Sequence, residues 1–280
     1  MSEEPHLLFE RDGHVAIITL NRPEKKNALS GEMLVRMYDA WLEIDRNPEI
    51  RVAIVTGAGG NFCSGADLKA MAAGHPEDEY TKRFAQDPDL HWKALLRHFV
   101  PGKPLIAAVE GYAVAGGLEL AIWCDLRVAA VDAVFAVSCR RWGVPLVDGG
   151  TVRLPRLVGH GNALDLILTG RSVGGEEARM MGLVNRLTPP GEALAHAVEL
   201  ARELARFPQG CLRGDRRSCY EQWDLDLPSA LRNETEIGLG VIASGETLAG
   251  ATRFVAGAGR HGRPDEGVPP TGSDGAASTK

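Results

Sequence analysis

The sequence lacks the features that mark several large classes of protein. Its five cysteines are odd in number and show no CxxC spacing. No apolar run approaches the ~20 residues that a membrane-spanning helix needs, because Gly, Glu or Arg interrupts each one. No signal peptide is visible in the opening MSEEPHLLFE. These absences together predict reduced thiols and a cytoplasmic protein without a membrane partner.

An excess of basic residues is also missing. The formal net charge is −6, whereas a protein that binds nucleic acid in general needs a basic face. We therefore expect no nucleic-acid partner. This charge remains compatible with one anionic small ligand held by a local cluster of lysines.

Three signatures of common enzyme classes are absent or broken. The glycine loop Thr56–Asn61 departs from the TGxxxGxG pattern of short-chain dehydrogenases, and no tyrosine is followed by a lysine four residues later. No serine lies in the GxSxG pattern of an acyl-enzyme hydrolase, and the metal-binding pattern HExxH is missing. We expect neither a nicotinamide cofactor nor a metal.

The length and composition suit a globular protein with a sizeable core, since the chain has 280 residues of which 44% are hydrophobic. Repeated strand-strand-helix patterns predict an α/β core over residues 1–190. Long amphipathic patterns at residues 191–207 and 227–242 predict a helical C-terminal region over residues 191–258. Residues 259–280 are rich in Gly, Pro and Ser, which predicts a disordered tail.

Local patterns predict individual elements of the core. Ser30 is expected to cap a helix, a polar helical segment is expected near residues 77–99, and another helix near Leu118. Short apolar runs predict strands at His14–Leu20, Val52–Thr56, Leu105–Val109, Leu126–Ala129, Ala133–Ala136 and Leu183–Val184.

Five motifs in a fixed order are more specific than any of these patterns. They are Asn21–Leu29 (NRPEKKNAL), Asn61–Leu68 (NFCSGADL), Lys103–Leu120 (KPLIAAVEGYAVAGGLEL), Leu168–Gly170 (LTG) and Ala178–Val184 (ARMMGLV). In this order and spacing they resemble the crotonase (enoyl-CoA hydratase/isomerase) superfamily over most of the chain. Ala115 stands where the family has the first of three glycines.

The resemblance implies a crotonase-like core of stacked ββα turns and a C-terminal helical region used for trimerisation. It implies an acyl-CoA substrate, with coenzyme A part of the substrate and no separate cofactor. It also implies an oxyanion hole of two backbone amides, which by position belong to Ala66 and Gly116. Two such donors suit a thioester carbonyl that becomes an enolate. The expected assembly is a homotrimer or a dimer of trimers.

The same resemblance places candidate substrate contacts in the first two motifs. Lysines at these loops either meet the phosphates of coenzyme A or are solvated surface residues, and the sequence leaves both readings open. The candidate substrate-binding residues are Lys25, Lys26, Ala28, Asp67, Leu68 and Lys69.

The catalytic acids depart from the hydratase pattern. Glu119 matches the first of two family glutamates, but Cys139 stands where the second is expected, and a buried thiol is a poor base. Asp148 resembles the aspartate of dienoyl-CoA isomerases and naphthoate synthases, or else it is the N-cap of a helix near Gly150. The resemblance therefore implies an enzyme that hydrates or isomerises an enoyl-CoA. A CoA-thioester-binding protein without catalysis and a thioester hydrolase or C–C bond enzyme remain alternatives.

Overall fold

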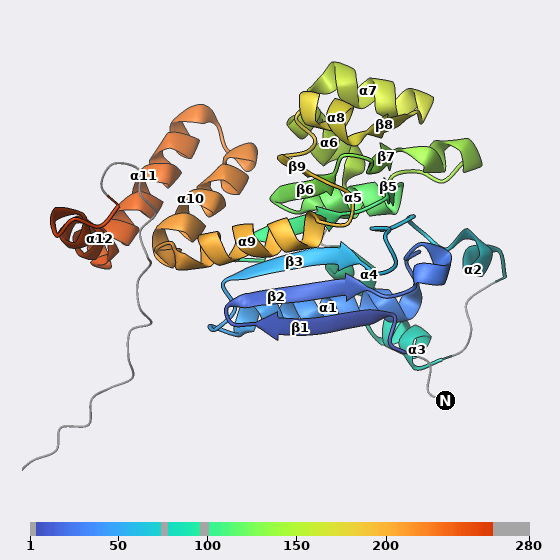
Figure 1. Ribbon diagram of the computed structural model, residues 1–280, viewed down its shortest axis with the longest axis horizontal. Helices are drawn as coiled ribbons and strands as arrows, with labels where there is room; N and C mark the ends of the chain where they lie inside the picture. The colour runs from blue at the N-terminus through green and yellow to red at the C-terminus, as the bar shows by residue number, and fades with distance from the viewer. Residues whose placement is uncertain (1–3, 74–77, 96–100, 260–280) are drawn as a thin grey trace, which may run out of the picture. The chain divides into compact units, whose positions relative to one another are not determined.

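The computed structural model describes residues 4–73, 78–95 and 101–259. The chain forms two compact units, residues 1–202 and 203–280, which are described separately (Figure 1). The division expected near residue 190 stays a prediction, and residues 260–280 of the expected tail lie outside the described residues. No helix in the described part of the chain is long and apolar enough to cross a membrane.

The first unit alternates strands and helices. Its strands are β1 (Leu7–Asp12), β2 (Val15–Leu20), β3 (Val52–Gly57), β4 (Leu105–Val109), β5 (Tyr112–Val114), β6 (Leu126–Ala130), β7 (Val134–Ala136), β8 (Ser172–Gly174) and β9 (Arg186–Thr188). Its helices are α1 (Gly31–Arg46), α2 (Leu68–Ala73), α3 (Glu79–Gln86), α4 (Leu90–Ala94), α5 (Gly116–Trp123), α6 (Gly150–Val158), α7 (His160–Thr169), α8 (Gly175–Met180) and most of α9 (Ala193–Arg206), with short 3-10 turns η1 (Pro23–Lys25) and η2 (Ser138–Trp142).

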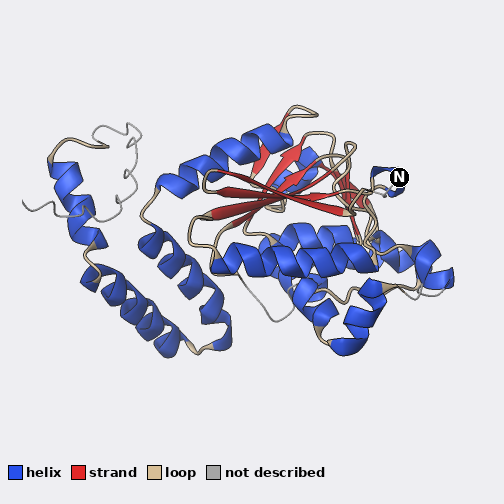
Figure 2. Ribbon diagram, turned by 90° about the horizontal axis from the view of Figure 1, so that it is seen from below, coloured by secondary structure: helices blue, strands red, loops and turns tan. Residues whose placement is uncertain are grey.

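Two sheets organise this unit. In the described residues, six strands form one sheet in the order β1-β2-β3-β4-β6-β9, parallel except for the β1–β2 pair, and three form a smaller sheet in the order β5-β7-β8. Consecutive strands β4 and β5, and then β6 and β7, enter different sheets. Each of these two turns of the chain therefore adds one strand to each sheet before the next helix, which is the stacked ββα arrangement expected from the sequence; Figure 2 shows the strands with the helices packed around them.

The smaller sheet continues as single backbone bridges through the two motif loops. Cys63 pairs with Ala113 of β5, and Ala66 pairs with Leu29. Hydrogen bonds from Leu29 N to Gly65 O (2.8 Å) and from Cys63 N to Tyr112 O (2.8 Å) hold this column together. As a result, loops far apart in the sequence lie on adjacent turns.

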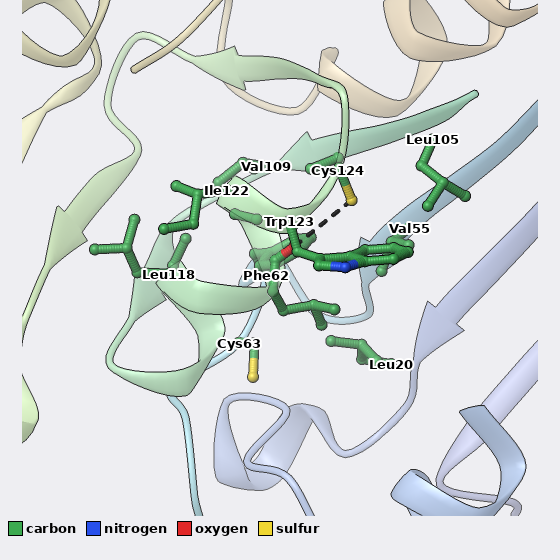
Figure 3. Packing of buried hydrophobic residues seen from close by; sticks show 14 of the residues in the cluster. Leu20, Val55, Phe62, Cys63, Leu105, Val109, Leu118, Ile122, Trp123 and Cys124 are labelled. Carbon is green, nitrogen blue, oxygen red and sulfur yellow. Dashed lines mark hydrogen bonds between the residues drawn. The ribbon is translucent and has the colours of Figure 1, made fainter. Parts of the chain in front are cut away.

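The core lies between the large sheet and the helices. Helix α1 begins at Ser30, whose side chain accepts a hydrogen bond from Met33 N as expected, and it packs on β1 and β2. Helix α5 is buried on nearly all sides, with Leu118, Ile122 and Trp123 among residues of β3 and β4 (Figure 3). Burying apolar side chains of this size is the main stabilising contribution to such a core.

Several boundaries differ from the sequence predictions. The strand expected at Leu183–Val184 is wrong, because both amides bond to Ala178 O in the turn that closes α8, and the strand begins at Arg186. The polar segment expected near residues 77–99 contains two helices, α3 and α4, and its ends lie outside the described residues. Strand β1 was not predicted. It is an edge strand with only Leu7 buried, so it lacks the apolar run of the central strands.

The second unit is helical. It contains α10 (Gln209–Glu221), the short η3 (Gln222–Asp224), α11 (Leu227–Ala243) and α12 (Glu246–Val255). Ile237 of α11 is buried, and its Cγ2 lies 3.1 Å from the point where Gly214 of α10 would carry a Cβ. Helices α10 and α11 therefore pack closely through a residue without a side chain.

Candidate active site

The two predicted oxyanion-hole residues lie on touching loops. A side chain added at Gly65 would place its Cβ 3.0 Å from Gly116 N and 2.8 Å from the Ala115 Cβ. Gly65 has a φ of +87°, so both its conformation and its surroundings require glycine. The chain thus brings the Ala66 and Gly116 backbones close together on neighbouring turns.

Both amides are available for a ligand. Neither Ala66 N nor Gly116 N donates a hydrogen bond to another residue in the described part of the chain. Gly116 is the first residue of α5, where backbone N–H groups have no partner within the helix and the dipole is positive. Two such donors can stabilise negative charge on an oxygen.

Glu119 lies on the same helix, one turn after Gly116, and is only 3% exposed. Its Oε1 accepts hydrogen bonds from Asp148 N and Gly150 N, both at 2.8 Å. Burial raises the pKa of Glu119 to about 7; the Gly150 N–H opposes this rise, and the Asp148 charge adds to it. A carboxyl group with this pKa can gain or lose a proton near neutral pH.

Asp148 is buried beside the same loops. Its Oδ2 lies 3.7 Å from the point where Gly116 would carry a Cβ, and its side chain is 9% exposed. The N-cap alternative for Asp148 is wrong, because Gly149 is the N-cap of α6 and the Gly150 amide bonds to Glu119 instead. The carboxylate of Asp148 therefore faces the site.

Cys139 lies on η2, after β7, and is buried. Burial raises the pKa of its thiol, and the charge of Glu119 raises it further. The thiol is thus protonated at neutral pH and does not replace a second glutamate as a base. Among the described residues, no three His, Cys, Asp or Glu side chains are grouped as a metal site would require.

The candidate substrate-binding residues gather on two adjoining segments. Lys25 and Lys26 end η1 and begin the following loop, while Leu68 and Lys69 begin α2. Lys25 Nζ is 3.5 Å from Asp67 Oδ2, and Lys26 Nζ lies 4.1 Å from the centre of the Tyr112 ring. Leu68 and Lys69 are exposed, whereas Ala28 and Asp67 are buried. The contact between Lys25 and Asp67 joins the two segments that carry these candidate residues.

Two polar residues in the first motif were not assigned a role from the sequence. Arg22 is buried; its Nη1 donates to Ala28 O (2.6 Å) and its Nη2 to Asp67 Oδ2 (3.0 Å). Asn27 Nδ2 donates to Ala58 O (2.9 Å) and Asn61 O (2.6 Å). Together they fasten the first motif to the loop that carries Ala66. Their places in the NRP and NAL elements were the only signal.

A histidine also reaches the site. His91 Nε2 on α4 is 3.6 Å from Asp148 Oδ1. No spacing in the sequence singles out this histidine, because α4 meets the Asp148 loop only in the folded chain.

Comparisons with known proteins agree with this geometry. A family model described as enoyl-CoA hydratase/isomerase matches residues 10–256. The chain is 41% identical over 250 residues to enoyl-CoA hydratase EchA19 of Mycobacterium tuberculosis, covering 89% of this chain and 93% of that protein. It is 34% identical to a short-chain-enoyl-CoA hydratase of Clostridium acetobutylicum, covering 82% and 87% of the two chains.

Solved structures give the same result for the fold. The crystal structure of enoyl-CoA hydratase EchA1 from Mycobacterium marinum superposes with a TM-score of 0.82 at 35% sequence identity, covering 94% of this chain and 98% of that one. The stacked ββα fold predicted from the motifs is confirmed.

Proposed function

The chain belongs to the enoyl-CoA hydratase/isomerase family, and on that premise we propose that it hydrates or isomerises an enoyl-CoA through a thioester enolate. The N–H groups of Ala66 and Gly116 hold the thioester oxygen as negative charge develops on it. Neither amide donates to another group among the residues that the structure describes, which supports this role. Each donor of this kind contributes about 3–4 kcal/mol to lowering the barrier.

Glu119 is the proposed proton carrier, and its environment is the observation on which the proposal rests. Its Oε1 is fixed by hydrogen bonds from the Asp148 and Gly150 amides. A carboxyl group with a pKa of about 7 can take a proton from one substrate atom and return it to another.

Asp148 is the proposed second acid–base group. Hydration by the two-glutamate route needs a second carboxylate that holds water, and Cys139 does not supply one. With Glu119 and Asp148 both at the site, one group can remove a proton from the α carbon of a 3-enoyl-CoA while the other protonates the γ carbon. The pair thus suits isomerisation at least as well as hydration.

Replacing Glu119 with Gln tests the proposal. We expect turnover of both crotonyl-CoA and a 3-hexenoyl-CoA to fall at least about 100-fold in Glu119→Gln, the usual scale for an acid–base group. Binding of acetyl-CoA, measured by calorimetry, should survive. Unchanged turnover in a folded variant would overturn the mechanism, whereas release of free coenzyme A by the wild type would favour the hydrolase alternative.

The variant Cys139→Glu separates hydration from isomerisation. If Cys139 is what limits hydration, restoring a carboxylate at this position should raise the crotonyl-CoA hydration rate relative to 3-hexenoyl-CoA isomerisation. Cys139→Ser is the matched control, because it is small and polar but adds no carboxylate. Equal rates in both variants would show that the missing glutamate does not limit hydration.

The substrate's coenzyme A moiety is proposed to lie along Lys25, Lys26 and Lys69, with Ala28, Asp67 and Leu68 beside it. Lys25 and Lys26 lie at the end of η1, where Lys25 Nζ is 3.5 Å from Asp67 Oδ2, and Lys69 follows Asp67 at the start of α2. Lysine is a common phosphate partner.

We further propose that the active form is a homotrimer or a dimer of trimers, which the exposed apolar residues of the second unit support.

A further inference from the structure

A histidine on a separate helix adds a third ionisable group to the pair of carboxyls. Glu119 and Asp148 are 3% and 7% exposed, whereas the side chain of His91 is 44% exposed. The three groups therefore run from the interior of the protein to solvent. The two buried carboxyl groups are therefore largely shielded from solvent, whereas the imidazole of His91 is exposed to it.

Helix α4 holds His91 in place. Leu90 and Ala94 on either side of it are buried, and Trp41 Nε1 donates a hydrogen bond to Ala94 O at 2.8 Å. Lys93, the other basic residue of this helix, bonds to Asp87 at 2.7 Å instead of reaching the site. His91 of this helix lies beside Asp148, with its Nε2 3.6 Å from Asp148 Oδ1.

We propose that His91 passes protons between Asp148 and solvent, a role that rests on the proposed acid–base function of Asp148. The proton moves from His91 Nε2 to Asp148 Oδ1, the electron pair of the N–H bond stays on Nε2, and the neutral ring takes a new proton from water. The reverse steps discharge Asp148. The 3.6 Å separation of the two atoms is closed by rotation of the half-exposed ring, since acid–base contacts are often long without substrate.

This proton exchange is needed because two carboxyl groups, Glu119 and Asp148, are proposed to act in the same turnover. If one carboxyl takes a proton from the substrate and the other gives one, each must be reset before the next cycle. A carboxyl that is 7% exposed resets slowly unless another group connects it to water. His91 acts through Asp148 and is a positioning and exchange residue, without contact to the substrate carbons.

The variant His91→Ala tests the role by chemical rescue. With crotonyl-CoA and 3-hexenoyl-CoA as probes, we expect kcat to fall about tenfold or more while KM stays within about twofold. Added imidazole should restore part of kcat, because the truncated side chain leaves room for a soluble base next to Asp148. His160→Ala, which removes a histidine at the start of α7, is the matched control and should be unaffected with or without imidazole.

The possible outcomes separate this inference from the proposed function. Unchanged kcat in His91→Ala, while Asp148→Asn is impaired, would overturn the role of His91 and leave the proposed function intact. Loss of activity that imidazole does not restore, or that appears in KM alone, would mean a structural role and would also overturn it. Full activity in Asp148→Asn would remove both the acid–base role of Asp148 and the inference built on it.

Discussion

At Glu119, two opposing effects meet on one carboxyl group. Burial disfavours the charged form, whereas N–H donors from Asp148 and Gly150 favour it. Burial dominates, with the Asp148 charge in support, so the pKa rises to about 7 from its ordinary value of 4.5. This balance leaves a buried carboxyl that can hold or release a proton near neutral pH, as the acid–base role proposed for Glu119 requires.

This raised pKa makes the stability of the protein depend on pH. Between 4.5 and about 7, folded Glu119 retains a proton that the unfolded chain has released, so the free energy of unfolding falls as the pH rises through this window. Glu119→Gln removes the effect and should be more stable than the wild type by up to about 3 kcal/mol at pH 8. Near pH 4 the two should be similar.

Chemical denaturation at several pH values and a fixed protein concentration measures this difference. Glu176→Gln is the control, because Glu176 is exposed on α8 and the substitution changes the charge equally. A Glu119→Gln advantage that does not grow between pH 4 and pH 8 would contradict the proposed titration.

Ala115 carries backbone strain next to the Gly116 amide. It has φ +54° and ψ −125°, a region that favours glycine, and it stands where the family has one. Ala115→Gly should stabilise the protein by about 1 kcal/mol, the relieved strain less the added freedom of the unfolded chain. Ala113→Gly is the control; it should destabilise, since Ala113 lies in β5 and is fully buried. Denaturant midpoints that fall for both variants would argue against strain at Ala115.

Among the elements, those defined by continuous motifs could be predicted best. The sequence patterns predicted the inner strands of the large sheet, β2, β3, β4 and β6. They also predicted a helix after the glycine turn that precedes Glu119. Each of these features depends on residues that are neighbours in the sequence. The edge strand β1, the start of β9 and the approach of His91 to Asp148 were not. These depend on which elements meet in the fold, and local propensity carries no information about that.

The N-cap of α6 shows the same limit in a single position. Asp148 suits an N-cap by residue type, and a helix does begin at Gly150. Glu119 is nevertheless the residue that accepts from the Gly150 amide, and the Asp148 side chain lies beside Gly116 instead. A carboxylate from a neighbouring element has replaced the local cap.

The link between the first motif and α2 is an element-scale contact that we expect to be strong. Arg22 and Asp67 form an ion pair at 3.0 Å with side chains only 5% and 8% exposed. Removing Arg22 leaves the buried Asp67 carboxylate with only the exposed Lys25 as an ion-pair partner in the described residues, so Arg22→Met should cost about 3 kcal/mol. The loop that carries Ala66 should also loosen, and kcat should fall.

A double-mutant cycle measures the pair directly. Arg22→Met combined with Asp67→Leu should be less destabilised than the sum of the two single variants, because the unpaired charge is gone. Lys25→Met is the matched control, since Lys25 meets the same carboxylate from an exposed position and should cost less than about 1 kcal/mol. Strict additivity would show that the two side chains do not interact.

At the scale of the whole molecule, the second unit exposes more apolar surface than a short helical segment normally leaves uncovered. Ile237 is buried between α10 and α11, but many other large apolar residues of this unit are not. Those at least half exposed in the described residues are Trp223, Leu227, Leu231, Leu239, Ile242, Leu248, Phe254 and Val255. Exposed apolar surface in this amount is typical of a region that packs on another protein chain.

We therefore expect the second unit to pack on neighbouring copies of the chain and to hold a trimer or a dimer of trimers. Sedimentation velocity at micromolar concentration should show no monomer for the wild type. Leu231→Glu together with Leu239→Glu places two charges on the exposed side of α11 and should dissociate the assembly, because burying an unpaired charge is costly. Arg232→Glu is the matched control, a charge reversal on the same helix that removes no apolar surface, and it should leave the assembly intact. A wild-type monomer would overturn the expectation, and an intact oligomer in the double variant would place the interface elsewhere.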